Sequence, residues 1–313
     1  MDRIAAEAAR HWGLEDARIV LAARRENVVY RVTAGDADYA LRLHRPGYRN
    51  AAQLESELQW MAVLAEGGLD VPAPLATCAG GFLAEVGGHL VDVLSWVPGA
   101  ALGKAGQLEG VADRAGFCRA LGAAMARMHD IGDAWVRPEG FTRPSWDRDG
   151  LLGEAPLWGR FWDHPHLGTE DRELLLEVRA QADAALAGIE TEADYGLIHA
   201  DLLSENMLFD NGRIWLIDFD DGGWGFRDFE LATFLLRFTG APDYAGLRAA
   251  LCDGYAVRRT VDPARLDLFL LLRALTYPGW IMDRLGEPGA EERSARAIST
   301  AVEQARLWLG RRA

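Results

Sequence analysis

The first hundred residues alternate apolar and polar positions in a way that predicts β-strands. Val28, Tyr30 and Val32 alternate with polar residues, and a second alternating run follows across Gly35-Asp36. Two such runs joined by a glycine turn predict a β-hairpin. Two more strands are predicted on either side of Gly87-Gly88. The predicted strand segments beyond the first run are residues 39–43, 82–85 and 89–96.

Apolar residues at helical spacing dominate the remainder of the chain. Residues 1–14 and 53–64 predict helices within the strand-rich part, because apolar side chains recur there every three or four residues. After Pro98-Gly99 the pattern is mainly helical, with helices expected at 116–129, 174–189, 229–238 and 266–275. We therefore predict an α+β fold of two lobes. A small β-rich lobe spans residues 1–95, and a larger α-rich lobe spans residues 96–313.

Composition narrows the classes of function. The chain has 313 residues, half of them hydrophobic, which suffices for a large core around a cleft. The formal net charge is −14, and no basic face is evident, so we expect no nucleic-acid partner. An acidic surface favours cationic ligands, although the simpler interpretation is that the charge keeps the protein in solution.

The cysteine spacing and the apolar segments indicate the redox state of the thiols and the cellular location of the protein. Cys78, Cys118 and Cys252 are far apart, which argues against a disulfide framework or a zinc site and predicts reduced, buried thiols. The N-terminal residues do not have a secretory pattern. The apolar stretch 266–282 contains Arg273 and is short for a membrane span, so we expect a core helix, no membrane partner and a cytoplasmic protein.

The segment from residue 197 to residue 221 carries the chemistry. A strand end delivers His199 and Asp201 into a loop, Asn206 follows, and a hairpin through Asn211-Gly212 returns the chain to Asp218. We expect this hairpin to bring Asp201, Asn206 and Asp218 together.

Two carboxylates and an amide oxygen form a hard site that suits Mg²⁺ sharing the phosphate oxygens of ATP. One carboxylate would orient an attacking hydroxyl while the other groups hold metal, which is the set that phosphoryl transfer requires. The spacing His-x-Asp-x4-Asn, then a strand pair, then Asp-Phe matches the kinase catalytic loop and its metal-binding segment. Each residue alone would pass for an ordinary turn residue.

With Ile198-His199-Ala200-Asp201, Asn206 and Ile217-Asp218-Phe219-Asp220-Asp221, the chain resembles the aminoglycoside phosphotransferase and choline kinase superfamily. That group includes type II homoserine kinases and a bacterial Ser/Thr kinase branch, and the resemblance implies a two-lobed protein-kinase-like fold. The resemblance extends over nearly the whole chain, including residues 27–32, 41–46, 56–58 and 96–99 and the helix-ending Met128-His129.

This resemblance implies a role for each matching residue. Asp201 is the catalytic base, and Asn206 and Asp218 are magnesium ligands. Glu57 pairs with the basic residue that contacts phosphate, and Ser95, Trp96 and Val97 meet the adenine of ATP through their backbones. His199 packs and holds the loop, while Glu230 is a buried acid that braces it.

The chain departs from the family pattern in two places. Arg42 stands where lysine is usual, and we interpret it as a functional replacement, since Lys104 is the only lysine in the chain. Residues 22–27 lack the glycines of a phosphate-covering loop, so Asn27 and Arg24 are candidates to cover the nucleotide.

Several further polar residues have two interpretations. Asp220 either contacts a second metal or is a solvated acid. Asp221 and Trp224 either line the acceptor pocket or belong to a surface turn at Gly222-Gly223. For His164 and His166 we favour solvent exposure over metal binding.

The sequence thus predicts an ATP- and Mg²⁺-dependent phosphotransferase acting on a hydroxyl of a small molecule. Its acceptor could be an amino alcohol, homoserine-like, choline-like or aminoglycoside-like. The alternatives are a Ser/Thr protein kinase of the same superfamily and a nucleotide-binding pseudokinase that acts through a partner.

Overall fold

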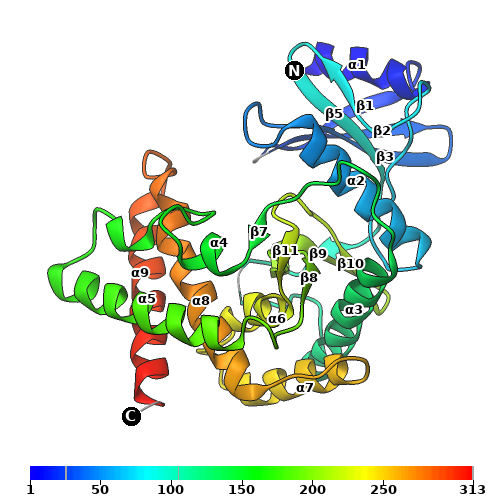
Figure 1. Cartoon of the computed structure of the whole chain (residues 1–313). Coiled ribbons are helices and arrows are strands. Elements are labelled where there is room, and N and C mark those ends of the chain that lie inside the picture. Colours follow the sequence, from blue (N-terminus) through cyan, green and yellow to red (C-terminus); the bar gives the residue numbers. More distant parts are fainter. Residues whose placement is uncertain (25–26, 105, 312–313) are drawn as a thin grey trace. The chain divides into compact units, whose positions relative to one another are not determined.

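The computed structural model describes residues 1–24, 27–104 and 106–311 (Figure 1). The chain divides into two compact units. The first unit comprises residues 1–110, 130–143 and 204–220, and the second comprises residues 111–129, 144–203 and 221–313. Both units are therefore discontinuous along the chain, and the segment 197–221 passes from one to the other at residues 203–204 and 220–221. The predicted division at residue 95, into a nucleotide-binding lobe and a lobe for catalysis and substrate binding, remains a prediction.

An antiparallel five-stranded sheet dominates the first unit, in the order β1-β2-β3-β5-β4. The predicted hairpin is confirmed: Ala34 pairs with Ala37, so Gly35 and Asp36 form a two-residue turn. The strands are β1 (Arg18–Arg24), β2 (Val28–Ala34), β3 (Ala37–Leu43), β4 (Ala84–Val86) and β5 (His89–Ser95).

Two helices accompany this sheet. α1 (Asp2–Ala9) buries Ala5, Ala8 and Ala9 in one core with sheet residues, then continues as a 3-10 turn (Arg10–Trp12) that ends at the left-handed Gly13. α2 (Ala51–Glu66) extends the predicted helix at both ends. It begins earlier because Asn50 and Gln53 form a reciprocal capping box.

A smaller sheet, β10-β9-β6, completes the first unit. It contains β6 (Ala100–Ala101), β9 (Met207–Asp210) and β10 (Arg213–Leu216). Asp210 pairs with Arg213 across Asn211 and Gly212, which both have left-handed backbone angles. Asn-Gly favours this turn because both residues tolerate positive φ. The predicted return hairpin of the 197–221 segment is therefore present.

The second unit is largely helical, and Figure 1 shows its helices around a short sheet. The sheet has the order β7-β11-β8, formed by β7 (Ser145–Trp146), β8 (Tyr195–Ile198) and β11 (Gly223–Phe226). The helices are α3 (Arg114–Ala134, which runs on into the first unit), α4 (Arg148–Leu152), α5 (Thr169–Ile189), α6 (Arg227–Leu236), α7 (Tyr244–Ala256), α8 (Pro263–Met282) and α9 (Ala290–Gly310).

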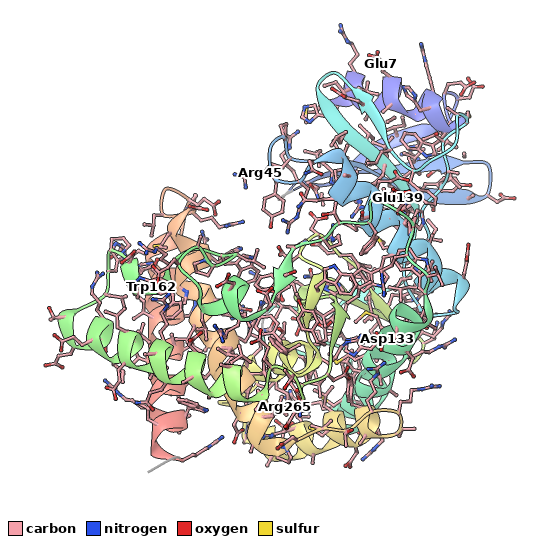
Figure 2. All side chains as sticks on the ribbon, in the orientation of Figure 1. Glu7, Arg45, Asp133, Glu139, Trp162 and Arg265 are labelled. Carbon is pink, nitrogen blue, oxygen red and sulfur yellow. The ribbon has the colours of Figure 1, made fainter. Side chains whose placement is uncertain are left out.

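Side-chain packing fixes these helices around the sheet. Every residue of α6 is buried, and Phe226 of β11 packs against Phe269 of α8. Arg265, at the start of α8, donates to Asp228 of α6 at 2.6 Å (Figure 2). A short 3-10 turn (Phe161–Asp163) inserts Trp162 beneath Arg179 of α5, with the guanidinium carbon 3.9 Å from the ring centre (Figure 2). The first two contacts hold the end of β11 and the start of α6 against α8.

The model confirms a β-sheet N-terminal region followed by a helical C-terminal region. The apolar stretch 266–282 lies within α8 and is a core helix, as predicted. Across residues 1–24, 27–104 and 106–311, no helix is long and apolar enough to cross a bilayer. The expectation of buried thiols is wrong for Cys78, which is exposed because it lies in a surface turn, whereas Cys118 is buried.

Candidate active site

The loop after β8 is held by a buried carboxylate. Glu230 of α6 has no exposed surface, and its carboxylate accepts the backbone N–H groups of His199 at 2.5 Å and Ala200 at 3.2 Å. Burial raises the pKa of Glu230 to about 7, although these two N–H groups and neighbouring arginines oppose the rise. Glu230 therefore braces the loop, as the resemblance implied.

The backbone of this loop is strained where it reaches Asp201. Ala200 has a φ of 65°, in the left-handed region that alanine rarely occupies. His199 is fully buried, and its Nδ1 accepts the N–H of Asp201 at 3.4 Å. A strained residue persists only where its surroundings determine it, and Glu230 and His199 supply that constraint.

Asp201 contacts a buried arginine of α8. Its Oδ1 accepts a hydrogen bond from Nη2 of Arg273 at 2.7 Å, and the Asp201 side chain is 20% exposed whereas that of Arg273 is not exposed. The same Nη2 donates to the hydroxyl of Tyr277 at 2.8 Å. No sequence motif indicated this pair, because the two residues are 72 positions apart and Arg273 lies in an apolar helix.

Asn206 and Asp218 lie at the same end of the β9–β10 hairpin. The last strand pair joins Met207 to Leu216, and the N–H of Ile217 then donates to the carbonyl of Asn206 at 3.0 Å. Asp218 follows directly, with a φ of 68°. The structure therefore brings Asn206 and Asp218 together in the first unit, while Asp201 belongs to the second unit, five residues earlier in the chain.

These residues suit a hard divalent cation. Asp218 offers a carboxylate and Asn206 an amide oxygen, which are magnesium ligands by type. Buried Oδ1 of Asp220 has no hydrogen-bond partner within the described ranges, and Nη1 of Arg42 lies 3.6 Å from it. No group of three or more His, Cys, Asp or Glu among the residues described could form a metal cage. A site of one or two carboxylates suits Mg²⁺, which keeps waters and shares phosphate oxygens.

Arg42 lies in a cage of carboxylates in the first unit. It donates to both oxygens of Asp92 at 2.8 Å and to Glu57 at 3.1 Å, so the predicted Arg42–Glu57 pair is present. Burial alone would lower the pKa of Arg42, but Asp92 and Glu57 raise it well above its usual value. Burial would likewise raise the pKa of Asp92, whereas Arg42 and His44 lower it to about 2.

Arg143 connects this cage to the backbone that follows Asp218, and the sequence did not single it out. It donates to Glu57 at 3.1 Å and to the backbone carbonyls of Phe219 and Asp220, both at 2.8 Å. Arg143 is 5% exposed. Glu57 thus has two arginine partners, and one of them also holds the backbone that follows Asp218.

A family model, the phosphotransferase enzyme family, matches residues 19–269 of the chain. This range includes Arg42, Glu57, Asp201, Asn206 and Asp218. The chain belongs to the phosphotransferase enzyme family.

Individual relatives of this phosphotransferase are small-molecule kinases. A homoserine kinase of Gluconobacter oxydans (strain 621H) is 30% identical over 251 residues, covering 76% of this chain and 71% of the relative. The solved structure of a microcompartment-associated aminopropanol kinase is 28% identical, with a TM-score of 0.80 over 97% of this chain and 95% of that one. An amicoumacin kinase solved with AMP-PNP and Ca²⁺ has the same fold, at 21% identity and a TM-score of 0.75 over 97% and 93% of the two chains.

The segment predicted to contact adenine is partly occupied by internal hydrogen bonds. The N–H of Ser95 donates to Ala73 at 2.8 Å, and the N–H of Trp96 donates to Asp38 at 3.0 Å. The ring of Trp96 lies under the guanidinium of Arg31, 5.0 Å away. An adenine contact in this phosphotransferase would therefore use Val97 or backbone carbonyls rather than these two N–H groups.

The predicted nucleotide cover is only partly described. Arg25 and Glu26 lie outside the described residues, and Arg24 ends β1 with an exposed side chain. Asn27 donates to Oδ2 of Asp220 at 2.6 Å and accepts the N–H of Arg45 at 3.3 Å. Asn27 thus contacts the acid that follows Asp218-Phe219, and the solvated-acid interpretation of Asp220 is wrong, because this side chain is 7% exposed.

The expectation of a surface turn at Gly222-Gly223 is wrong. Both glycines are buried, and Gly223 starts β11, which pairs with β7 and β8. A Cβ at Gly223 would lie 2.2 Å from the carbonyl oxygen of Pro144, so the glycine permits close strand packing. The backbone carbonyl of Asp221 accepts a hydrogen bond from Nε1 of Trp146 at 2.9 Å. The backbone N–H of Trp224 donates to the carbonyl of Pro144, also at 2.9 Å. Their predicted role in the acceptor pocket remains a prediction.

Two expectations about histidines are also corrected. His164 is buried rather than exposed, and its Nδ1 accepts the N–H of His166, which is itself exposed. His129 does not end its helix, since α3 continues to Ala134. It is fully buried and bonds the hydroxyl of Tyr255 at 2.8 Å. Burial holds the pKa of His129 well below its usual value.

Proposed function

We propose that this phosphotransferase moves the γ-phosphoryl group of ATP to the hydroxyl of a small amino alcohol, with Mg²⁺ as cofactor. The acceptor oxygen bonds to the γ-phosphorus, the bond to the bridging oxygen of ADP breaks, and the hydroxyl proton passes to a base. Asp201 is that base and orients the hydroxyl. Asn206 and Asp218 hold the cation, which would neutralise charge on the phosphates when bound.

The remaining residues bind and position ATP. Arg42, fixed by Glu57 and Asp92, points Nη1 toward Asp220 and offers it to a phosphate oxygen. Val97 and the backbone near it contact adenine, and Asn27 lies next to the metal-binding segment. In this proposal residues 1–95 bind nucleotide, and residues 96–313 carry catalysis and the acceptor site.

The backbone of the two catalytic loops is the observation that carries this proposal. Outside glycine, the described residues include three with left-handed φ, namely Ala200, Asn211 and Asp218. Asn211 is explained by its hairpin turn, whereas Ala200 precedes the proposed base and Asp218 is itself a proposed ligand. Strain of this kind concentrates at functional sites, where neighbouring contacts maintain it.

The relatives favour an amino alcohol as acceptor. The homoserine kinase and the aminopropanol kinase are the most informative, because both names denote a small molecule with an amine and a hydroxyl. Choline-like and aminoglycoside-like acceptors are the competing classes, and a protein acceptor is the outcome that would favour the Ser/Thr kinase alternative.

The test measures ADP release from Mg²⁺-ATP against homoserine, 1-amino-2-propanol, choline, ethanolamine and aminoglycosides. We expect an amino alcohol to stimulate release, and Asp201→Ala to lower the stimulated rate by about 100- to 10,000-fold, the range for a lost general base. Asp253→Asn, which removes an exposed acid of α7, is the matched control and should keep full activity.

Two results would contradict the proposal. If Asp201→Ala kept the full acceptor-stimulated turnover, the assignment of Asp201 as the base would be refuted. Stabilisation of the fold by Mg²⁺-ATP with no acceptor-dependent ADP release would instead support a nucleotide-binding pseudokinase.

A further inference from the structure

We propose that Arg273 is a positioning residue that sets the orientation of the Asp201 carboxylate, an assignment that rests on the function proposed above. The resemblance to kinases supplied no role for a residue of α8. The proposal comes instead from the contacts of a buried cation with the proposed base.

Arg273 is fully buried, and its charge is balanced by Asp201, the acid of the loop that it contacts. Both of its side-chain hydrogen bonds pass through Nη2, to Asp201 at 2.7 Å and to Tyr277 at 2.8 Å. Nε and Nη1 have no hydrogen-bond partner within residues 1–24, 27–104 and 106–311. Glu230 also interacts electrostatically with Arg273. A buried cation requires a nearby anion, and Asp201 is the carboxylate in direct contact.

Aromatic rings fix the plane of the guanidinium. Its central carbon lies 4.5 Å from the ring centre of Trp158, 4.7 Å from that of Tyr277 and 5.4 Å from that of Phe229. At these distances the rings form cation–π contacts with the guanidinium. These contacts stabilise its charge, since Nε and Nη1 have no hydrogen-bond partner within the described residues. Because the guanidinium is planar and held among rings, Nη2 can point only toward Asp201 and Tyr277.

The loop is thus fixed at two levels. Glu230 holds the backbone N–H groups of His199 and Ala200, and Arg273 holds the side chain of the next residue through Oδ1. Without Arg273 the carboxylate of Asp201 loses the charged hydrogen bond at Oδ1, and with it the orientation that this contact imposes. Misplacement of a reacting group by about 1 Å can lower turnover about 100-fold.

Arg273→Met tests the assignment, because methionine fills much of the same space without a donor or a charge. With the acceptor that most stimulates the wild type, we expect kcat to fall about 100-fold, while the KM for Mg²⁺-ATP stays unchanged. Arg237→Met is the matched control. Arg237 also stacks on Tyr277, 4.0 Å from the ring centre, but among the described residues it forms no hydrogen bond or ion pair with Asp201, so kcat should be retained.

Two further measurements separate positioning from a general effect on folding. In an Asp201→Asn background, Arg273→Met should cause no further loss of kcat, because the carboxylate that it positions is already absent. In Arg273→Ala, guanidinium ion well below its unfolding concentration should partly restore kcat. If Arg273→Met does not fold, Tyr277→Phe keeps the ring but removes one bond of Nη2, and it should lower kcat with the KM for ATP unchanged.

The inference is overturned if Arg273→Met keeps wild-type kcat, or if the losses from Asp201→Asn and Arg273→Met multiply in the double variant. Absence of acceptor-stimulated ADP release from the wild type would refute the proposed function itself and this assignment with it. Activity in the wild type together with equal activity in Arg273→Met would refute the role of Arg273 alone.

Discussion

Replacing Glu230 with glutamine changes the buried acid that holds the loop before Asp201 while keeping its size. The wild-type carboxylate accepts two N–H groups, from His199 and Ala200. Glutamine has a single acceptor oxygen, so one N–H would face an amide that cannot accept it. Leaving one buried donor unpaired costs about 1–3 kcal/mol.

Because Glu230 can ionise and glutamine cannot, the effect of this substitution on the free energy of unfolding depends on pH. Its pKa is about 7 in the folded protein, against an ordinary value of 4.5, chiefly because of burial. Between these values the unfolded chain has released the proton and the folded protein still holds it, so stability falls as pH rises. At 1.36 kcal/mol for each pKa unit, the total loss across that window is about 3 kcal/mol.

Urea unfolding of the wild type and of Glu230→Gln at pH 5 and pH 8 measures this effect, because titrations common to both proteins cancel in the difference. At pH 5 both side chains are neutral in the folded protein, but the carboxyl hydroxyl oxygen can still accept the second N–H whereas the amide NH2 group cannot, so the wild type should be the more stable by about 1–3 kcal/mol. At pH 8 the advantage should shrink or reverse. Glu139→Gln, which changes an exposed acid (Figure 2), should show no such dependence. A difference between Glu230→Gln and wild type that is the same at both pH values would refute the reasoning.

Two other substitutions test packing and the support of the metal-binding segment. In Gly122→Ala the new Cβ would lie 2.1 Å from the carbonyl oxygen of Leu251, so α3 and α7 must separate, and we expect urea unfolding to report a loss of about 1–3 kcal/mol. Gly188→Ala, with nothing within 4 Å, should be neutral or stabilising by up to about 1 kcal/mol, and equal losses in both variants would contradict the packing argument. Arg143→Met removes the bonds to the carbonyls of Phe219 and Asp220, so thermal shift should show a smaller stabilisation by Mg²⁺-ATP than in wild type; an unchanged shift would exclude this supporting role.

Local patterns in the sequence were sufficient to predict the hairpins and the first helices. Gly35-Asp36 and Asn211-Gly212 specify turns by their own backbone preferences, and α2 follows from apolar spacing. α7 and α9 were not predicted. α9 has Gly289 at its N-cap and no side-chain cap, and although its buried residues recur at helical spacing, most of them are small or polar, so the apolar pattern of this helix is weak.

The parts of the candidate site that the sequence could not supply depend on contacts between distant residues. Arg143 lies 86 positions from Glu57, and neither it nor Arg273 belongs to a motif. Gly222-Gly223 resembled a turn because glycine is common in turns, whereas their role is to admit a neighbouring strand. The motif residues Asp201, Asn206 and Asp218 could be selected from their spacing, but the groups that hold them could not.

The carboxylate cage around Arg42 has a consequence for covalent chemistry. Reagents built on an ATP-like scaffold that acylate or sulfonylate a lysine amine require a nucleophilic amine at the phosphate site. A guanidinium whose pKa is raised by Asp92 and Glu57 stays protonated and offers no such nucleophile. Amine-directed reagents would instead modify the side chain of the exposed Lys104. The enzyme should therefore escape lysine-directed kinase probes while accepting a label at one defined lysine, far along the chain from Arg42.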